Sequence, residues 1–194
     1  NLVLKVFVLL ACILVLVLTS LARPMITLLA SEKYIEAAVI VFPLLMALAL
    51  ESISWITEIG LILERRTGLK LVGYLLGTLA SVLGIFLLAP ALGLAGVSIA
   101  VLLGSIVKTA AVTLLARRVH NLHWELANFV IILPATFIGG TVIQRVATDH
   151  GAVAALALCA AVVLVLVGLT YAVVLPPDQR GRIRETLQRR GLLQ

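Results

Sequence analysis

The sequence has 194 residues, of which 62% are hydrophobic and 12% are charged, with a mean hydropathy of +1.21 and a net charge of +6. A water-soluble domain of this length cannot hide so much apolar surface in one core, so the composition excludes a soluble protein and indicates an integral membrane protein. The positive charge does not require a nucleic-acid partner, because the basic residues lie where they would orient helices and face anionic lipid.

Six apolar stretches are long enough to cross a membrane, which takes about 20 residues. They cover residues 2–22, 34–63, 69–88, 95–116, 126–146 and 152–175. Short links with turn-forming residues separate them, so neighbouring helices are expected to be antiparallel. The sequence therefore predicts an all-α integral membrane protein, with a six-transmembrane-helix bundle over residues 1–175 and a basic tail over residues 176–194.

The basic residues are distributed unevenly between the two sides that this topology creates. One side holds ten of them, in the links after the second and fourth stretches and in the tail: Arg65, Arg66, Lys70, Arg117, Arg118, Arg180, Arg182, Arg184, Arg189 and Arg190. The other side holds three: Arg23, Lys33 and Arg145. The positive-inside rule makes the ten-residue side cytoplasmic, which places both ends of this chain in the cytoplasm and requires an even number of spans.

The second stretch contains two glutamates, Glu51 and Glu58, although membrane spans normally exclude charge. Seven residues separate them, so on a regular helix both carboxylates and Trp55 lie near one face, with the acids about 10 Å apart along the axis. Ionisable side chains at such depth usually face protein or water. We expect this face to look into the protein and to line a substrate or ion pathway.

Lys108 is the basic residue placed deepest in the fourth stretch. Counted along a regular helix it lies about 13 Å from Arg117, at the same depth as Glu58, whereas Glu51 falls near the midplane. One hypothesis is a Glu58–Lys108 ion pair that only ties two helices together. The other is that these groups line a hydrated cavity and meet a charged substrate or a coupling ion.

Three smaller patterns favour structural roles. Gly73, Gly77, Ser81 and Gly84 form a stripe of small residues that predicts close contact with another helix. His120, His123 and Glu125 flank Trp124, and we interpret this link as an interfacial belt rather than a metal site. In the tail, Ile183 and Leu187 lie among the five arginines listed above, a pattern typical of an amphipathic helix on an anionic membrane surface.

Catalytic signatures of soluble enzymes do not occur in the sequence. It has no glycine-rich phosphate loop, no Ser/His/Asp arrangement and no CxxC pair. The polar sequence outside the apolar stretches is also too short for a catalytic domain. Transport without a cofactor is therefore the expected function, rather than an enzymatic reaction.

Three stretches carry a resemblance to a known family. They are the segment 32–38 (EKYIEAA), the link 63–67 (LERRT) and the segment 88–100 (LAPALGLAGVSIA). In their Tyr-x-x-Ala start, basic link and Pro-x-x-Gly-x-x-Gly turn they resemble the C-terminal half of polysaccharide (oligosaccharide-lipid) flippases. These flippases belong to the multidrug/oligosaccharidyl-lipid/polysaccharide exporter superfamily.

The resemblance implies a transporter of two six-helix bundles in the bacterial inner membrane, with this chain as the second bundle and the first bundle lying upstream. A lipid-linked oligosaccharide for cell-envelope polysaccharide synthesis would enter from the cytoplasm, and rocking of the bundles would expose it outside. A cation-coupled multidrug exporter of the same superfamily is the nearest alternative. Further alternatives are a membrane-embedded enzyme of envelope synthesis, against which the short outer links argue, and a structural subunit.

Overall fold

The structure is a computed structural model that describes residues 2–63, 65, 67–119 and 127–170. Every element in these residues is helical, and no strand occurs among them. In chain order the elements are α1 (Leu2–Leu29), the 3₁₀ helix η1 (Glu32–Ala37), α2 (Ala38–Thr57), α3 (Ile59–Leu63), α4 (Thr67–Val119), α5 (Ala127–Asp149) and α6 (Gly151–Leu169). The predicted all-α class is confirmed for this part of the chain.

Four segments of the described chain are helical, long and apolar enough to cross a membrane: Val6–Leu29, Glu32–Thr57, Thr67–Arg118 and Gly151–Leu169. This is compatible with the membrane protein that the composition predicts. The count of six spans stays a prediction, since α4 counts once here and α5 is not among the four.

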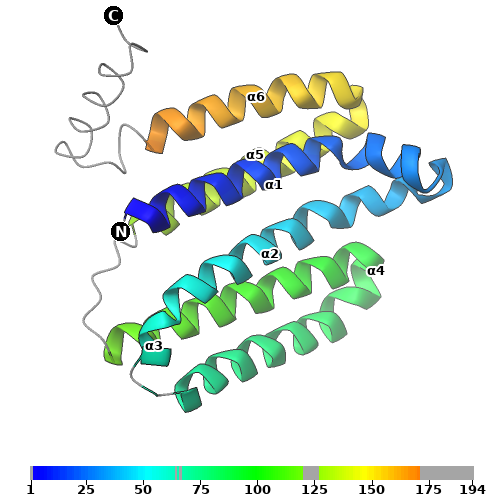
Figure 1. The fold of residues 1–194 in the computed structure, drawn as a ribbon. Coiled ribbons are helices and arrows are strands. Elements are labelled where there is room, and N and C mark those ends of the chain that lie inside the picture. Colours follow the sequence, from blue (N-terminus) through cyan, green and yellow to red (C-terminus); the bar gives the residue numbers. More distant parts are fainter. Residues whose placement is uncertain (1, 64, 66, 120–126, 171–194) are drawn as a thin grey trace, which may run out of the picture.

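The helices lie roughly alongside one another (Figure 1). The first helix, α1, packs against α2, α5 and α6, and α2 in turn packs against α4. Apolar side chains form the contacts, with Phe42 and Met46 of α2 at the centre of one buried cluster and Leu16 of α1 in another. The α2 helix therefore connects the α1–α5–α6 group with α4.

One residue divides α4 into two arms. Gly93 has φ 59° and ψ −134°, a combination that glycine tolerates far better than residues with a Cβ atom, and the chain reverses there to form two antiparallel arms (Figure 1). The first arm precedes Gly93 and the second follows it. This confirms the turn expected between residues 89 and 93.

The small-residue stripe lies between these arms. A Cβ atom added at Gly77 would lie 2.5 Å from the Cβ atom of Lys108, and one at Gly84 would lie 3.0 Å from that of Ala100. Side chains at these positions would force the arms apart, so the stripe allows their close approach. The prediction of close helix contact is confirmed.

Two helix boundaries differ from the expected ones. The first helix continues through Pro24 to Leu29, so this proline, which costs the helix one backbone hydrogen bond, does not end it. The stretch 34–63 is not one continuous helix: η1 precedes α2, and a turn at Glu58 separates α2 from α3. Glu58 therefore lies at the junction of two helices rather than within one.

Candidate functional site

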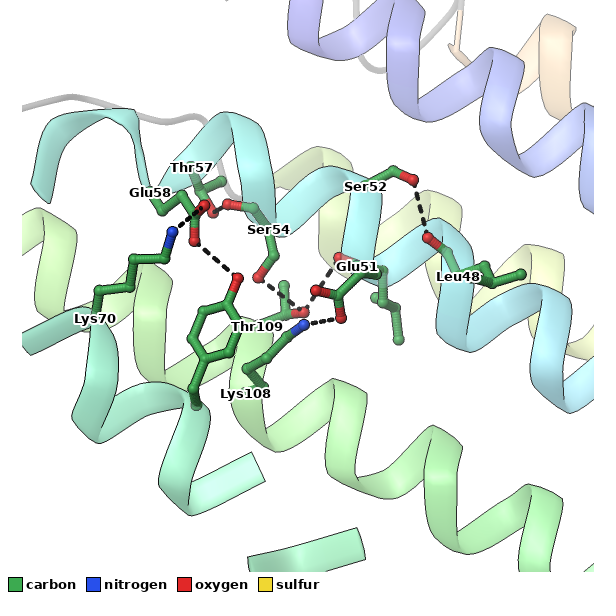
Figure 2. A network of polar contacts seen from close by, with 11 residues as sticks. Leu48, Glu51, Ser52, Ser54, Thr57, Glu58, Lys70, Lys108 and Thr109 are labelled. Atoms are coloured by element: carbon green, nitrogen blue, oxygen red, sulfur yellow. Dashed lines mark hydrogen bonds and ion pairs between the residues drawn. The ribbon is translucent and has the colours of Figure 1, made fainter. Parts of the chain in front are cut away.

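Glu58 is bound by two side chains of the first arm of α4 (Figure 2). The Lys70 ammonium lies 2.8 Å from Glu58 Oε1, and the Tyr74 hydroxyl donates a hydrogen bond of 3.2 Å to Glu58 Oε2. Lys70 and Tyr74 are four residues apart, so a regular helix presents both on one face. The Glu58 carboxylate thus has a charged and a neutral donor, as a buried charge requires.

Lys108, on the second arm of α4, forms an ion pair with Glu51 of α2 (Figure 2). This part of the second arm packs closely against the first arm, because a Cβ atom on Gly77 would lie 2.5 Å from the Lys108 Cβ. The rest of the lysine side chain extends to α2, where its ammonium lies next to the Glu51 carboxylate.

Tyr74 connects the two ion pairs. Its ring centroid lies 4.8 Å from the Lys108 ammonium and 5.4 Å from the Lys70 ammonium, distances at which a cation is attracted by the ring. Together the groups form one cluster, which we call the charge network: Glu51, Glu58, Lys70, Tyr74 and Lys108. Its two carboxylates balance its two ammonium groups, so the network is neutral as a whole.

Hydroxyl groups fix α2 against the second arm of α4. Thr109 donates to the Leu50 carbonyl (3.3 Å) and accepts from Ser54 (3.4 Å), and Thr113 donates to Thr57 (3.4 Å). Residues later in α2 thus contact residues later in the arm, so the two segments run parallel. In this register Lys108 lies level with Glu51, and Glu58 lies more than one turn further along.

The hypothesis of a Glu58–Lys108 pair is therefore wrong. That hypothesis takes the depth of Glu58 and of Lys108 in the membrane from their distances to the ends of the apolar stretches. This assumes that the two helices that carry them end at the same level. Instead α2 ends at Thr57, whereas α4 continues to Val119. The nearer base for Glu58 is Lys70, on the other arm.

The two ion pairs differ in exposure. The Glu51 side chain is 32% exposed, whereas its partner Lys108 is 9% exposed; the Glu58 side chain is 6% exposed and Lys70 31%. Trp55 is 61% exposed and lies on the surface of α2. Glu51 is thus the more exposed acid of the network.

Sequence reasoning did not connect Lys70 or Tyr74 with the glutamates. The distribution of charge predicts only an orienting role for Lys70, and the one sequence signal for its further role is its four-residue spacing to Tyr74. The tail arginines Arg180, Arg182, Arg184, Arg189 and Arg190 and the link residues His120, His123 and Glu125 lie outside the described residues. Their expected roles stay predictions.

Comparison with known proteins assigns no family. No family model, no curated protein and no solved structure matches this chain. Its function is therefore inferred from the apolar helices and the charge network.

Proposed function

We propose that this chain is the second six-helix bundle of a transporter that moves a lipid-linked oligosaccharide across the bacterial inner membrane by alternating access. The observation that carries the proposal is the charge network itself. Two of its ionisable side chains, Glu51 and Lys108, lie within strongly apolar helices, where a charge is costly, and such residues mark substrate and ion pathways. The sequence resemblance described above supports the same class of transporter.

Six spans are consistent with the helices described. The two arms of α4 each have the length of a span, and α1, α2, α5 and α6 would supply the other four. The 23 residues of α5 reach about 34 Å, which exceeds the roughly 30 Å of the hydrocarbon core. In this arrangement the first bundle of the transporter would face the present one across a central pathway.

The distribution of charge supports the proposed orientation. Both ends of α4 lie at the end of the bundle that carries α3, on the left in Figure 1. Among the described residues, the ends of α4 and the link before it hold Arg65, Lys70, Arg117 and Arg118. The opposite end carries η1 and the junction of α5 and α6. It holds Arg23, Lys33 and Arg145 together with the acids Glu32, Glu36 and Asp149. The first end is the more positive, so we place it in the cytoplasm.

Within the charge network we assign different roles to the two ion pairs. The Glu58–Lys70 pair, with its carboxylate almost fully buried, ties the start of α4 to the end of α2. The Glu51–Lys108 pair has the more accessible carboxylate and is the part that meets the substrate or a coupling ion during transport.

The test is transport by the full protein in proteoliposomes, with a lipid-linked oligosaccharide whose sugar is fluorescent. The variant is Glu51→Gln combined with Lys108→Met, because removing both charges leaves neither one unpaired. We expect normal abundance and loss of transport. Glu36→Gln, on an exposed acid of η1, is the matched control and should transport normally. Transport by the double variant at the rate of the control would refute the role of this pair.

A cation-coupled multidrug exporter is the second candidate, and the exposure of Glu51 favours it, since an accessible carboxylate suits a proton, sodium or a cationic drug. The same proteoliposomes separate the two functions. Efflux of a cationic dye that depends on Glu51, without movement of the oligosaccharide, would favour the exporter.

A further inference from the structure

A groove of about 590 Å³ lies between α2, the second arm of α4 and α5, within the usual size range of ligand sites. Met46 and Leu50 line it from α2, and Pro134 and Phe137 line it from α5. Along α4 it extends from Leu102 to Leu114, about 18 Å of helix, which is more than half the thickness of the hydrocarbon core. None of the groups of the charge network lines it.

The lining of the groove offers a ligand no free hydrogen-bond donor. Its two hydroxyls belong to Thr109 and Thr113, and both already donate hydrogen bonds to α2. The remaining lining residues are apolar. A sugar or an ion would lose its hydration there with almost no replacement, whereas a hydrocarbon chain has no hydrogen bonds to lose.

The groove also differs from the contact between the two arms of α4. Helices pack in lipid through small residues, as the two arms of α4 do through Gly77 and Gly104. The groove presents large branched or aromatic side chains, such as Ile106, Leu133 and Phe137, with Ala110 as the small exception. This lining suits a flexible lipid chain, which can follow large side chains of irregular outline.

A positive charge lies beyond one end of the groove. Arg118 is exposed and follows Leu114 by four residues, so it lies one turn further on the same face of α4, about 6 Å along the axis. A lipid chain in the groove would therefore bring its headgroup phosphate towards a guanidinium, the side chain best suited to bind phosphate.

We propose that this groove binds one hydrocarbon chain of an anionic phospholipid, with the phosphate at Arg118. The site is independent of the proposed transport function, because it requires only that the helices lie in a membrane. Recognition is then divided between two features: the groove binds the chain whatever the headgroup, and Arg118 selects the anionic headgroup.

The test is native mass spectrometry of the full protein, washed in detergent after exposure to phosphatidylglycerol or to phosphatidylcholine with the same chains. The wild type should retain one lipid and prefer phosphatidylglycerol. Ala110→Trp and Ile138→Trp, which fill the groove from α4 and from α5, should lose the lipid. Val107→Trp, an exposed position on the same arm outside the groove, is the control and should retain it. Arg118→Gln should retain lipid and lose the preference.

Failure of the wild type to retain lipid, or equal retention by Ala110→Trp and Val107→Trp, would overturn the proposal. An unchanged preference in Arg118→Gln would overturn the assignment of the headgroup, and a second copy of the chain in place of lipid would identify the groove as an interface.

Since the tryptophan variants also alter packing, a lipid with a photoreactive chain end offers a test on the unaltered protein. It should label groove residues such as Met46 and Phe137, and labelling confined to other surfaces would contradict the site.

Discussion

Gln144 supplies the hydrogen bond that Pro43 withholds from Val39. In a regular helix the carbonyl of Val39 would accept from the N–H of residue 43, but proline has none. The Gln144 side-chain amide, on α5, donates to this carbonyl at 2.8 Å and to that of Ala38 at 3.1 Å. A helix defect in α2 is thus repaired from α5, and the two hydrogen bonds join the two helices.

This relationship predicts that Gln144→Leu destabilises the protein, by about 1–3 kcal/mol, because a carbonyl in an apolar setting loses its partner. The measurement is thermal unfolding of the purified protein in detergent. In a Pro43→Ala background, the N–H of residue 43 can donate to the Val39 carbonyl. Gln144→Leu should therefore lower the free energy of unfolding by less in that background. Equal costs in both backgrounds would show that Gln144 does not act through the proline.

The Glu58–Lys70 pair predicts a specific rescue. Glu58→Gln leaves the Lys70 ammonium without its carboxylate, and since Lys70 is 31% exposed the loss should be smaller than the roughly 3–5 kcal/mol of a fully buried pair. Abundance in membranes should fall and should recover when Lys70→Met is added. Adding Lys108→Met instead should lower it further, because Glu51 would then lose its own partner. Recovery with Lys108→Met rather than Lys70→Met would contradict the pairing.

The contact between the arms of α4 predicts a contrast between two glycines. A Cβ atom at Gly77 would lie 2.5 Å from the Lys108 Cβ and 2.9 Å from the Gly104 carbonyl, so Gly77→Ala should cost about 1–3 kcal/mol through overpacking. Nothing lies within 4 Å of a Cβ atom at Gly68, and alanine there should be neutral or should stabilise the helix by up to about 1 kcal/mol. Thermal unfolding of both variants provides the comparison; similar losses would argue against close packing of the arms.

The proposed orientation predicts which exposed positions react from outside the cell. Cysteine at Asp149 should react with an impermeant thiol reagent in intact cells, whereas cysteine at Thr67 should react only after the membrane is opened. Both positions are exposed, and the native cysteines Cys12 and Cys159 are buried, so the background should be low. The reverse pattern would invert the topology.

The sequence alone reveals the apolar segments and the deep charges, because both depend on residue type. It does not reveal the partners of those charges, since these depend on the register between helices. Lys108 pairs with Glu51 rather than Glu58 because the hydroxyl of Thr109 bonds at the level of Leu50, a contact that no spacing along the chain encodes. The groove was likewise unpredictable, since three separate helices have to be in place before it exists.

The neutrality of the charge network has a consequence for the response to membrane voltage. One elementary charge crossing a potential of 100 mV changes the free energy by about 2.3 kcal/mol. When α2 and α4 move together, each carboxylate travels with its ammonium partner, and the electric field does almost no net work on them. When Lys108 moves away from Glu51 across the membrane, by contrast, charge is displaced along the field. The dependence of the transport rate on membrane voltage would therefore report whether Glu51 and Lys108 separate during the transport cycle.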